Sequence, residues 1–206
     1  QYITDLNLFI CPSASTYEHS EYVKNAKGKT AAQLQTQEGL TYFNYVQYTL
    51  NDYVNEGLEK GVPSVESRIA TFKSLVKRLG VGKVIWRFDP LILTDTLDVD
   101  NLLSKIKNIG DQLIGYTEKL VFSFADIESY RKVKSNLEHN NIKYRNFSER
   151  EMLDFTTKLA DLNKSWGYIL ATCGEKVSLE HHGVEHNKCI DDDLMIRFFS
   201  DDEILM

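Results

Sequence analysis

Two groups of side chains in the sequence combine residue types that can bind a ligand or a metal ion. In the first group, Arg87 and Asp89 stand two residues apart at the end of an apolar run. Side chains two apart on a strand project to the same face, so a guanidinium and a carboxylate would meet at the strand's carboxyl end. They either form a buried ion pair that fixes the strand end or bind a ligand, and we favour the ligand role. Asp126 also follows an apolar run, but its position is more typical of a helix N-cap.

The second group contains cysteine and histidine. Cys173 ends another apolar run, and His186 and Cys189 are three residues apart, so both could reach one metal ion. Thiolate and imidazole suit zinc or an iron–sulfur cluster. In that case the sulfurs of Cys173 and Cys189 lie within about 4 Å of each other, because tetrahedral Zn–S bonds are about 2.3 Å long. The alternatives are buried thiols with surface imidazoles, or a Cys173–His186 nucleophile pair.

Strands and helices that alternate along the chain must position these residues. Runs rich in β-branched and aromatic residues predict five strands, at 6–11, 43–50, 83–88, 120–124 and 168–172. Helical spacing of apolar residues predicts helices between them, from Ser64 to Gly80, from Asp98 to Gly115, from Ile127 to about Asn140, and from Ser148 to Leu162. This alternation predicts parallel strands joined by right-handed crossovers.

The predicted fold class is α/β, as a partial or complete parallel βα barrel of TIM type in a single domain over residues 1–206. An open doubly wound sheet is the alternative, but no glycine-rich phosphate loop follows any predicted strand. The polar segment 12–37 is predicted to be a long loop, with a short helix near 30–38. In βα folds the working residues lie at the carboxyl ends of the strands, where Arg87 and Asp89 are expected.

Composition excludes several classes of protein. The 206 residues are 42% hydrophobic and 26% charged, which is typical of a globular chain. The net charge of −6 gives no support for a nucleic-acid or membrane-surface binder, and no apolar run approaches the roughly 18 residues of a membrane span. Three cysteines and no signal peptide argue against a disulfide framework and predict a cytoplasmic location. Because the chain begins at Gln1 and ends abruptly at Met206, we expect a fragment of a longer protein.

Five separate segments of the sequence are distinctive when taken together. They are 86–94 (WRFDPLILT), 115–119 (GYTEK), 122–126 (FSFAD), 172–175 (TCGE) and 186–191 (HNKCID). In this order they resemble the bacterial family called domain of unknown function 1848, and the resemblance covers the chain from about Tyr42 to its end.

The resemblance implies a βα barrel of the kind that radical S-adenosylmethionine enzymes use. It also implies an iron–sulfur cluster and S-adenosylmethionine in the full-length protein, with the cluster held by a C-x-x-x-C-x-x-C-like triad in a cysteine-rich tail. The cysteines here are too far apart to form that triad. The residues that carry over are ligand-binding Arg87, Asp89 and Glu175, and metal-binding Cys173, His186 and Cys189.

Two hypotheses follow, and the sequence leaves open whether the chain is an enzyme. The first is the core of a radical S-adenosylmethionine-type enzyme with an unknown substrate. The second is a barrel without catalysis that binds a ligand or holds zinc through Cys173, His186 and Cys189. The expected partner is a small molecule, and a third option is that this chain alone carries no cofactor.

Overall fold

The computed structural model describes residues 45–199 apart from 60, 130, 174–176, 189 and 190. These residues belong to two compact units, with 45–187 in the larger unit and the rest, from 188 onward, in the smaller. The predicted strand at 6–11, the loop at 12–37 and the helix near 30–38 lie outside the described residues. No helix in the described part is long and apolar enough to cross a membrane.

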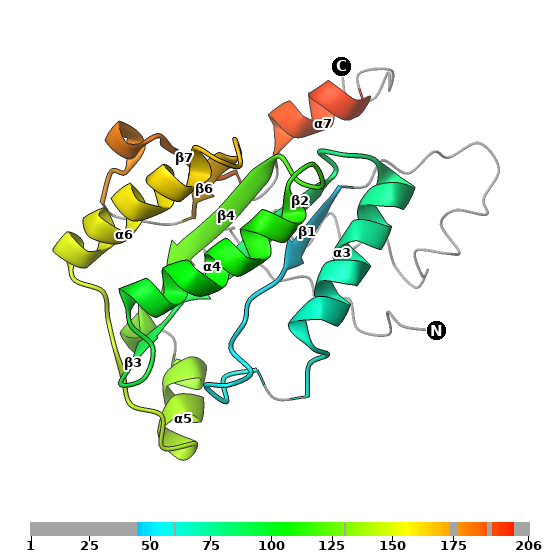
Figure 1. The fold of residues 1–206 in the computed structure, drawn as a ribbon. Coiled ribbons are helices and arrows are strands. Elements are labelled where there is room, and N and C mark those ends of the chain that lie inside the picture. The colour runs from blue at the N-terminus through cyan, green and yellow to red at the C-terminus, as the bar shows by residue number, and fades with distance from the viewer. Residues whose placement is uncertain (1–44, 60, 130, 174–176, 189–190, 200–206) are drawn as a thin grey trace, which may run out of the picture. The chain divides into compact units, whose positions relative to one another are not determined.

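A five-stranded parallel sheet forms the centre of the larger unit (Figure 1). Its strands are β1 (Val46–Thr49), β2 (Val84–Leu91), β4 (Lys119–Phe124), β6 (Ile169–Thr172) and β7 (Val184–His186). They lie side by side in chain order, and every neighbouring pair is parallel. The α/β class and four of the predicted strands are therefore confirmed.

The sheet differs from the sequence prediction in two respects. Within the described residues it is open, with β1 at one edge and β7 at the other, so a closed barrel is not observed. Strand β7 was not predicted, because two of its three residues are exposed and polar and it has no apolar run. It pairs with β6 through main-chain hydrogen bonds, which side-chain patterns do not report.

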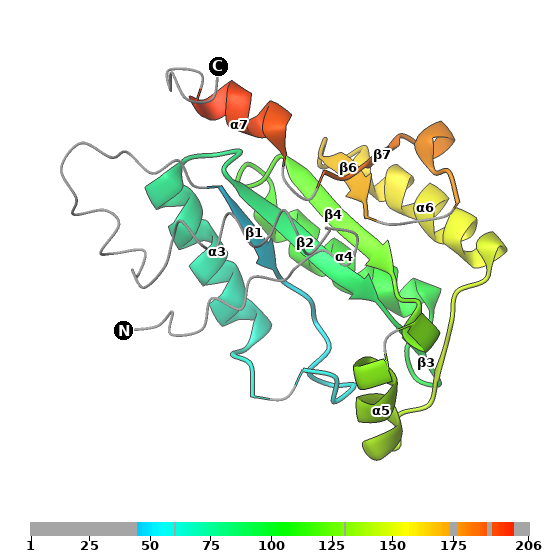
Figure 2. The same ribbon diagram turned by 180° about the vertical axis from the view of Figure 1, so that it is seen from behind.

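Three helices cover one face of this sheet: α3 (Val65–Leu79), α4 (Val99–Leu113) and α6 (Glu149–Asn163) (Figures 1 and 2). Each begins where its predicted cap stands. The side chain of Ser64 accepts a hydrogen bond from the Ser67 N–H, while Asp98 and Ser148 each form a capping box with the residue three positions later. We call the sheet face under these helices the helix face and the other the opposite face.

Alternation along the strands separates the side chains of the two faces. Trp86 and Phe88 of β2 belong to the core under the helices, together with Phe122 of β4. The indole of Trp86 donates a hydrogen bond to the Leu50 carbonyl at 2.9 Å, which ties β2 to the chain after β1. The residues that alternate with these core residues along β2 and β4 point to the opposite face, and among them Ile85 and Val121 are also buried.

Shorter elements surround the sheet. The predicted helix at 127–140 forms as a 3-10 turn, η1 (Ile127–Ser129), followed by α5 (Arg131–His139). A small antiparallel pair joins β3 (Leu93–Thr94) to β5 (Tyr144–Arg145), and η2 (Glu180–His182) connects β6 to β7. In the smaller unit, α7 spans Asp192–Phe199.

The close contact of Gly110 with Trp166 gives a stability prediction. A Cβ atom at Gly110, in α4, would lie 2.6 Å from the Trp166 ring, and the Trp166 indole is held by a hydrogen bond to Asp111. We expect Gly110→Ala to lower the free energy of unfolding by about 1–3 kcal/mol in urea denaturation, although alanine favours helices. Asn108→Ala, at an exposed site of the same helix, is the control and should be neutral or stabilising. A stabilised Gly110→Ala variant would contradict the packing.

The capping box of α6 gives a pH prediction. Hydrogen bonds from Arg145 and from Ser148 lower the pKa of Glu151 to about 2. Because the pKa of Glu151 is depressed in the folded state, the ionised carboxylate stabilises the fold. This stabilisation is complete above the ordinary glutamate pKa of 4.5 and is lost as the pH falls towards 2. We expect Glu151→Gln to cost about 1 kcal/mol of unfolding free energy at pH 7 and progressively less below pH 4.5. Urea denaturation at several pH values measures this, with Glu149→Gln as control; a cost independent of pH would refute it.

Candidate ligand site at the carboxyl edge of the sheet

Polar residues form a row across the opposite face at the carboxyl ends of the strands. Phe88, Phe122, Thr172 and His186 lie level with one another across β2, β4, β6 and β7. The residues that follow them are Asp89, Ser123, Cys173 and Asn187, which we call the carboxyl-edge row. The β2–β4 register shifts after Phe88, but hydrogen bonds join Asp89 to Arg87 and to Ser123 on the opposite face. If the alternation of β6 and β7 continues by one residue, Cys173 and Asn187 are directed to the same face.

Asp89 of this row forms an ion pair with Arg87, which is buried beneath it. The Nη2 of Arg87 donates to Oδ2 of Asp89, and its Nη1 donates to Oε1 of Gln47 at 2.7 Å. The hydroxyl of Ser123 donates to the other carboxylate oxygen of Asp89. The side chain of Arg87 is only 7% exposed and that of Asp89 is 18% exposed. Arg87 thus has both terminal nitrogens engaged, while the Asp89 carboxylate reaches the surface with acceptor capacity to spare.

The backbone at Asp89 is held from the neighbouring chain after β1. The Asp89 N–H donates to Oδ1 of Asn51 at 2.9 Å, and the Asn51 amide donates back to the Asp89 carbonyl at 3.2 Å. The hydroxyl of Tyr53 donates to the Pro90 carbonyl at 2.8 Å. Burial raises the pKa of Tyr53 well above its usual value, so this phenol remains a donor at neutral pH. These contacts fix the position of Asp89 at the edge.

The cysteine and histidine candidates are described only in part. Cys173 is half-buried just after β6, and His186 is exposed at the end of β7. His186 lines a cavity of about 260 Å³ together with Thr172. Because Thr172 and His186 are level, the next residue, Cys173, is directed away from His186 if alternation continues. Cys189 and Glu175 lie outside the described residues, so the shared metal site and the ligand role of Glu175 stay predictions.

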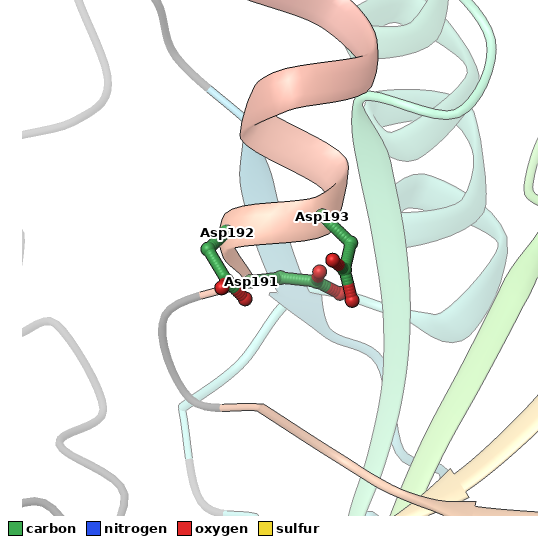
Figure 3. Close-up of side chains that lie close together, drawn as sticks. All are labelled: Asp191, Asp192 and Asp193. Atoms are coloured by element: carbon green, nitrogen blue, oxygen red, sulfur yellow. The ribbon is translucent and has the colours of Figure 1, made fainter. Parts of the chain in front are cut away.

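An acidic group in the smaller unit was not singled out from the sequence. The carboxylates of Asp191, Asp192 and Asp193 come together at the start of α7, within 4.8 Å of one another (Figure 3). Lys188 already contacts two of them, at 2.5 Å to Asp192 and 2.7 Å to Asp193. This ion pair raises the pKa of Lys188 and lowers that of Asp192. The three carboxylates are thus partly neutralised by a neighbouring lysine.

Sequence reasoning missed the residues that complete the carboxyl-edge site. Ser123 interrupts the apolar run of β4, a signal that could have marked a polar residue facing the end of the sheet. Asn51 and Gln47 show no such signal, because their partners are 38 and 40 residues away in the chain. Asn187 is only 2% exposed, a burial that the surrounding polar sequence does not suggest. Asp126, expected to be a helix cap, accepts a hydrogen bond from the Ser129 hydroxyl at 2.7 Å.

The ion pair makes a testable prediction about stability. Arg87→Met leaves the Asp89 carboxylate without its cation, and we expect a loss of about 3 kcal/mol of unfolding free energy in urea denaturation. The double variant Arg87→Met/Asp89→Asn should be destabilised by less than the sum of the two single variants, because both remove the same contact. Lys158→Met, which removes exposed ion pairs of α6 with Asp100 and Asp154, is the control and should leave the unfolding free energy almost unchanged. Additive effects of Arg87→Met and Asp89→Asn would show that the two side chains are not coupled.

Comparison with known proteins supplies a family but no characterised relative. The model of the family "Domain of unknown function (DUF1848)" matches residues 22–204. Neither the curated proteins nor the solved structures contain a match to the chain. Since the matched region covers most of the 206 residues, the chain belongs to the DUF1848 family.

Proposed function

We propose that the carboxyl-edge row is the small-molecule site of a βα-barrel-like enzyme core, in which Asp89 is the ligand-facing carboxylate. The observation that carries the proposal is the division of the sheet. Helices α3, α4 and α6 cover one face (Figures 1 and 2). On the other face, near the carboxyl ends of β2 and β4, Arg87, Asp89 and Ser123 form a hydrogen-bonded polar group. Active sites of βα folds lie at this edge.

The order of the strands favours part of a barrel rather than a doubly wound sheet. A doubly wound sheet reverses its strand order at a switch point and carries helices on both faces. Here the strands follow the chain order without reversal, and the three long helices of the larger unit share one face. Buried Ile85, Val121 and Ala171 on the opposite face resemble the side-chain layer that fills a barrel interior. The carboxyl-edge row lies above this apolar layer, at the position that the mouth of a barrel would have.

The contacts of Asp89 define what it can bind. Arg87 and Ser123 each donate to one of its oxygens, which leaves further lone pairs on both for a ligand. The suitable ligand group is a hydrogen-bond donor, either an ammonium or a hydroxyl. Arg87 then acts as a positioning residue, because its terminal nitrogens are engaged with Asp89 and Gln47. This differs from direct capture of a ligand carboxylate by Arg87, the role that the sequence suggested.

The family resemblance points to S-adenosylmethionine as the ligand to test first. Its methionine end carries an ammonium and its ribose carries hydroxyls, and both groups suit the Asp89 carboxylate. The cluster of a radical enzyme does not fit the cysteines of this sequence, because Cys11, Cys173 and Cys189 lack the triad spacing. Zinc binding through Cys173, His186 and Cys189 has less support, because continued alternation directs Cys173 and His186 to opposite faces.

Titration calorimetry with S-adenosylmethionine tests this proposal. We expect the chain to bind it saturably and Asp89→Asn to raise the dissociation constant about tenfold, the loss of one charge-assisted hydrogen bond. Asp154→Asn, on an exposed site of α6, is the matched control and should bind like the wild type. Circular dichroism verifies that Asp89→Asn is folded. No saturable binding by the wild type, or equal binding by folded Asp89→Asn, would overturn the proposal.

A further inference from the structure

Asn187 carries a buried amide that makes no side-chain hydrogen bond within the described part of the chain. It is 2% exposed, and neither its Oδ1 nor its Nδ2 has a partner among the described residues, although both atoms are buried. Its main chain is satisfied, since the Asn187 N–H donates to the Thr172 carbonyl at 2.8 Å and extends the pairing of β6 with β7. The backbone hydrogen bond therefore fixes the position of the residue, while the side-chain carboxamide makes no hydrogen bond to the described residues.

An unused carboxamide in this position needs an explanation. Burying an amide without hydrogen bonds is costly, and buried polar side chains in folded proteins almost always have partners. An apolar residue of similar shape would avoid that cost. Residues that break a local rule of stability in this way are concentrated at functional sites. The carboxamide of Asn187 is thus a candidate to pair with a group from outside the chain.

We propose that Asn187 is a specificity-determining residue of the carboxyl-edge site. Its amide presents one donor beside one acceptor, so it recognises a planar group that offers the complementary acceptor and donor. The amino edge of an adenine-type base and a primary carboxamide share this chemistry. The inference rests on the function proposed above and names the part of the ligand that lies farthest from Asp89.

The sheet geometry places the two ends of the ligand. Asp89 lies in the carboxyl-terminal half of β2 and Asn187 directly follows β7, and β4 and β6 separate these two strands. Three strand spacings amount to roughly 14 Å, so one elongated ligand that lies across the row can contact both residues. Its hydroxyl or ammonium end meets Asp89, and its planar end meets Asn187. Ser123 and Cys173 stand between the two ends in the row.

The experiment compares pairs of ligands in which one member carries the N–H donor and the other lacks it. Adenosine carries an amino group beside a ring nitrogen, whereas purine riboside lacks that amino group, and nicotinamide against nicotinic acid makes the same comparison for a carboxamide. We expect the wild type to prefer the amino or carboxamide member of one pair about tenfold in titration calorimetry. Asn187→Leu should abolish this preference, while the melting temperature of the ligand-free protein stays the same or rises. Asn187→Asp, which keeps the size of the side chain but only accepts, should also lose the preference.

Each outcome bears on the inference. Absence of any preference in the wild type overturns it, as does a preference that survives in folded Asn187→Leu or Asn187→Asp. A lower melting temperature for Asn187→Leu with the preference intact would show that a structural water satisfies the amide. Should Asn187→Leu fail to fold, Asn187→Asp decides the matter. The proposed function fails separately, when the wild type does not bind S-adenosylmethionine or when folded Asp89→Asn binds it as the wild type does.

Discussion

The guanidinium of Arg87 carries a full charge into a part of the sheet from which water is almost excluded. A charge in such a place must be paired, and the surrounding contacts meet that requirement. Asp89 supplies the opposite charge, Gln47 accepts a second hydrogen bond, and Ser123 holds the carboxylate from the next strand. Strands β1, β2 and β4 are thereby joined through side chains as well as through their main chains. Since removal of any one partner leaves a buried polar group unsatisfied, the group is stable only as a whole.

The division of the sheet into two faces gives this ion pair its significance. On the helix face, aromatic side chains such as Trp86, Phe88 and Phe122 pack under α3, α4 and α6. On the opposite face an apolar layer gives way to polar groups towards the carboxyl edge. Strand alternation produces both faces from one chain, because consecutive residues point in opposite directions. Stability thus comes mainly from one face, and the chemistry that we propose belongs to the other.

Much of the secondary structure was predictable because its signals are local. The caps at Ser64, Asp98 and Ser148 lie within three residues of the N–H groups that they satisfy, so their spacing is visible in the sequence. The buried strands read as apolar runs for the same reason, and four of them were found. Strand β7 was missed because its pairing with β6 depends on main-chain groups, which every sequence has. The break of the predicted helix at 127–140 into η1 and α5 also carried no clear local signal.

By itself the sequence determined the α/β class, the helix starts, and the placement of Arg87 and Asp89 towards the carboxyl end of a strand. Tertiary structure alone decided which side chains meet there. Ser123 reaches Asp89 across 34 residues of chain and Asn51 reaches it across 38, because the register of parallel strands is set by the packing of whole elements. The same register brings Asn187 level with the row and buries its amide without a partner among the described residues. Residue types and spacing determine what a strand end can offer, but only the assembled sheet determines which groups remain for a ligand.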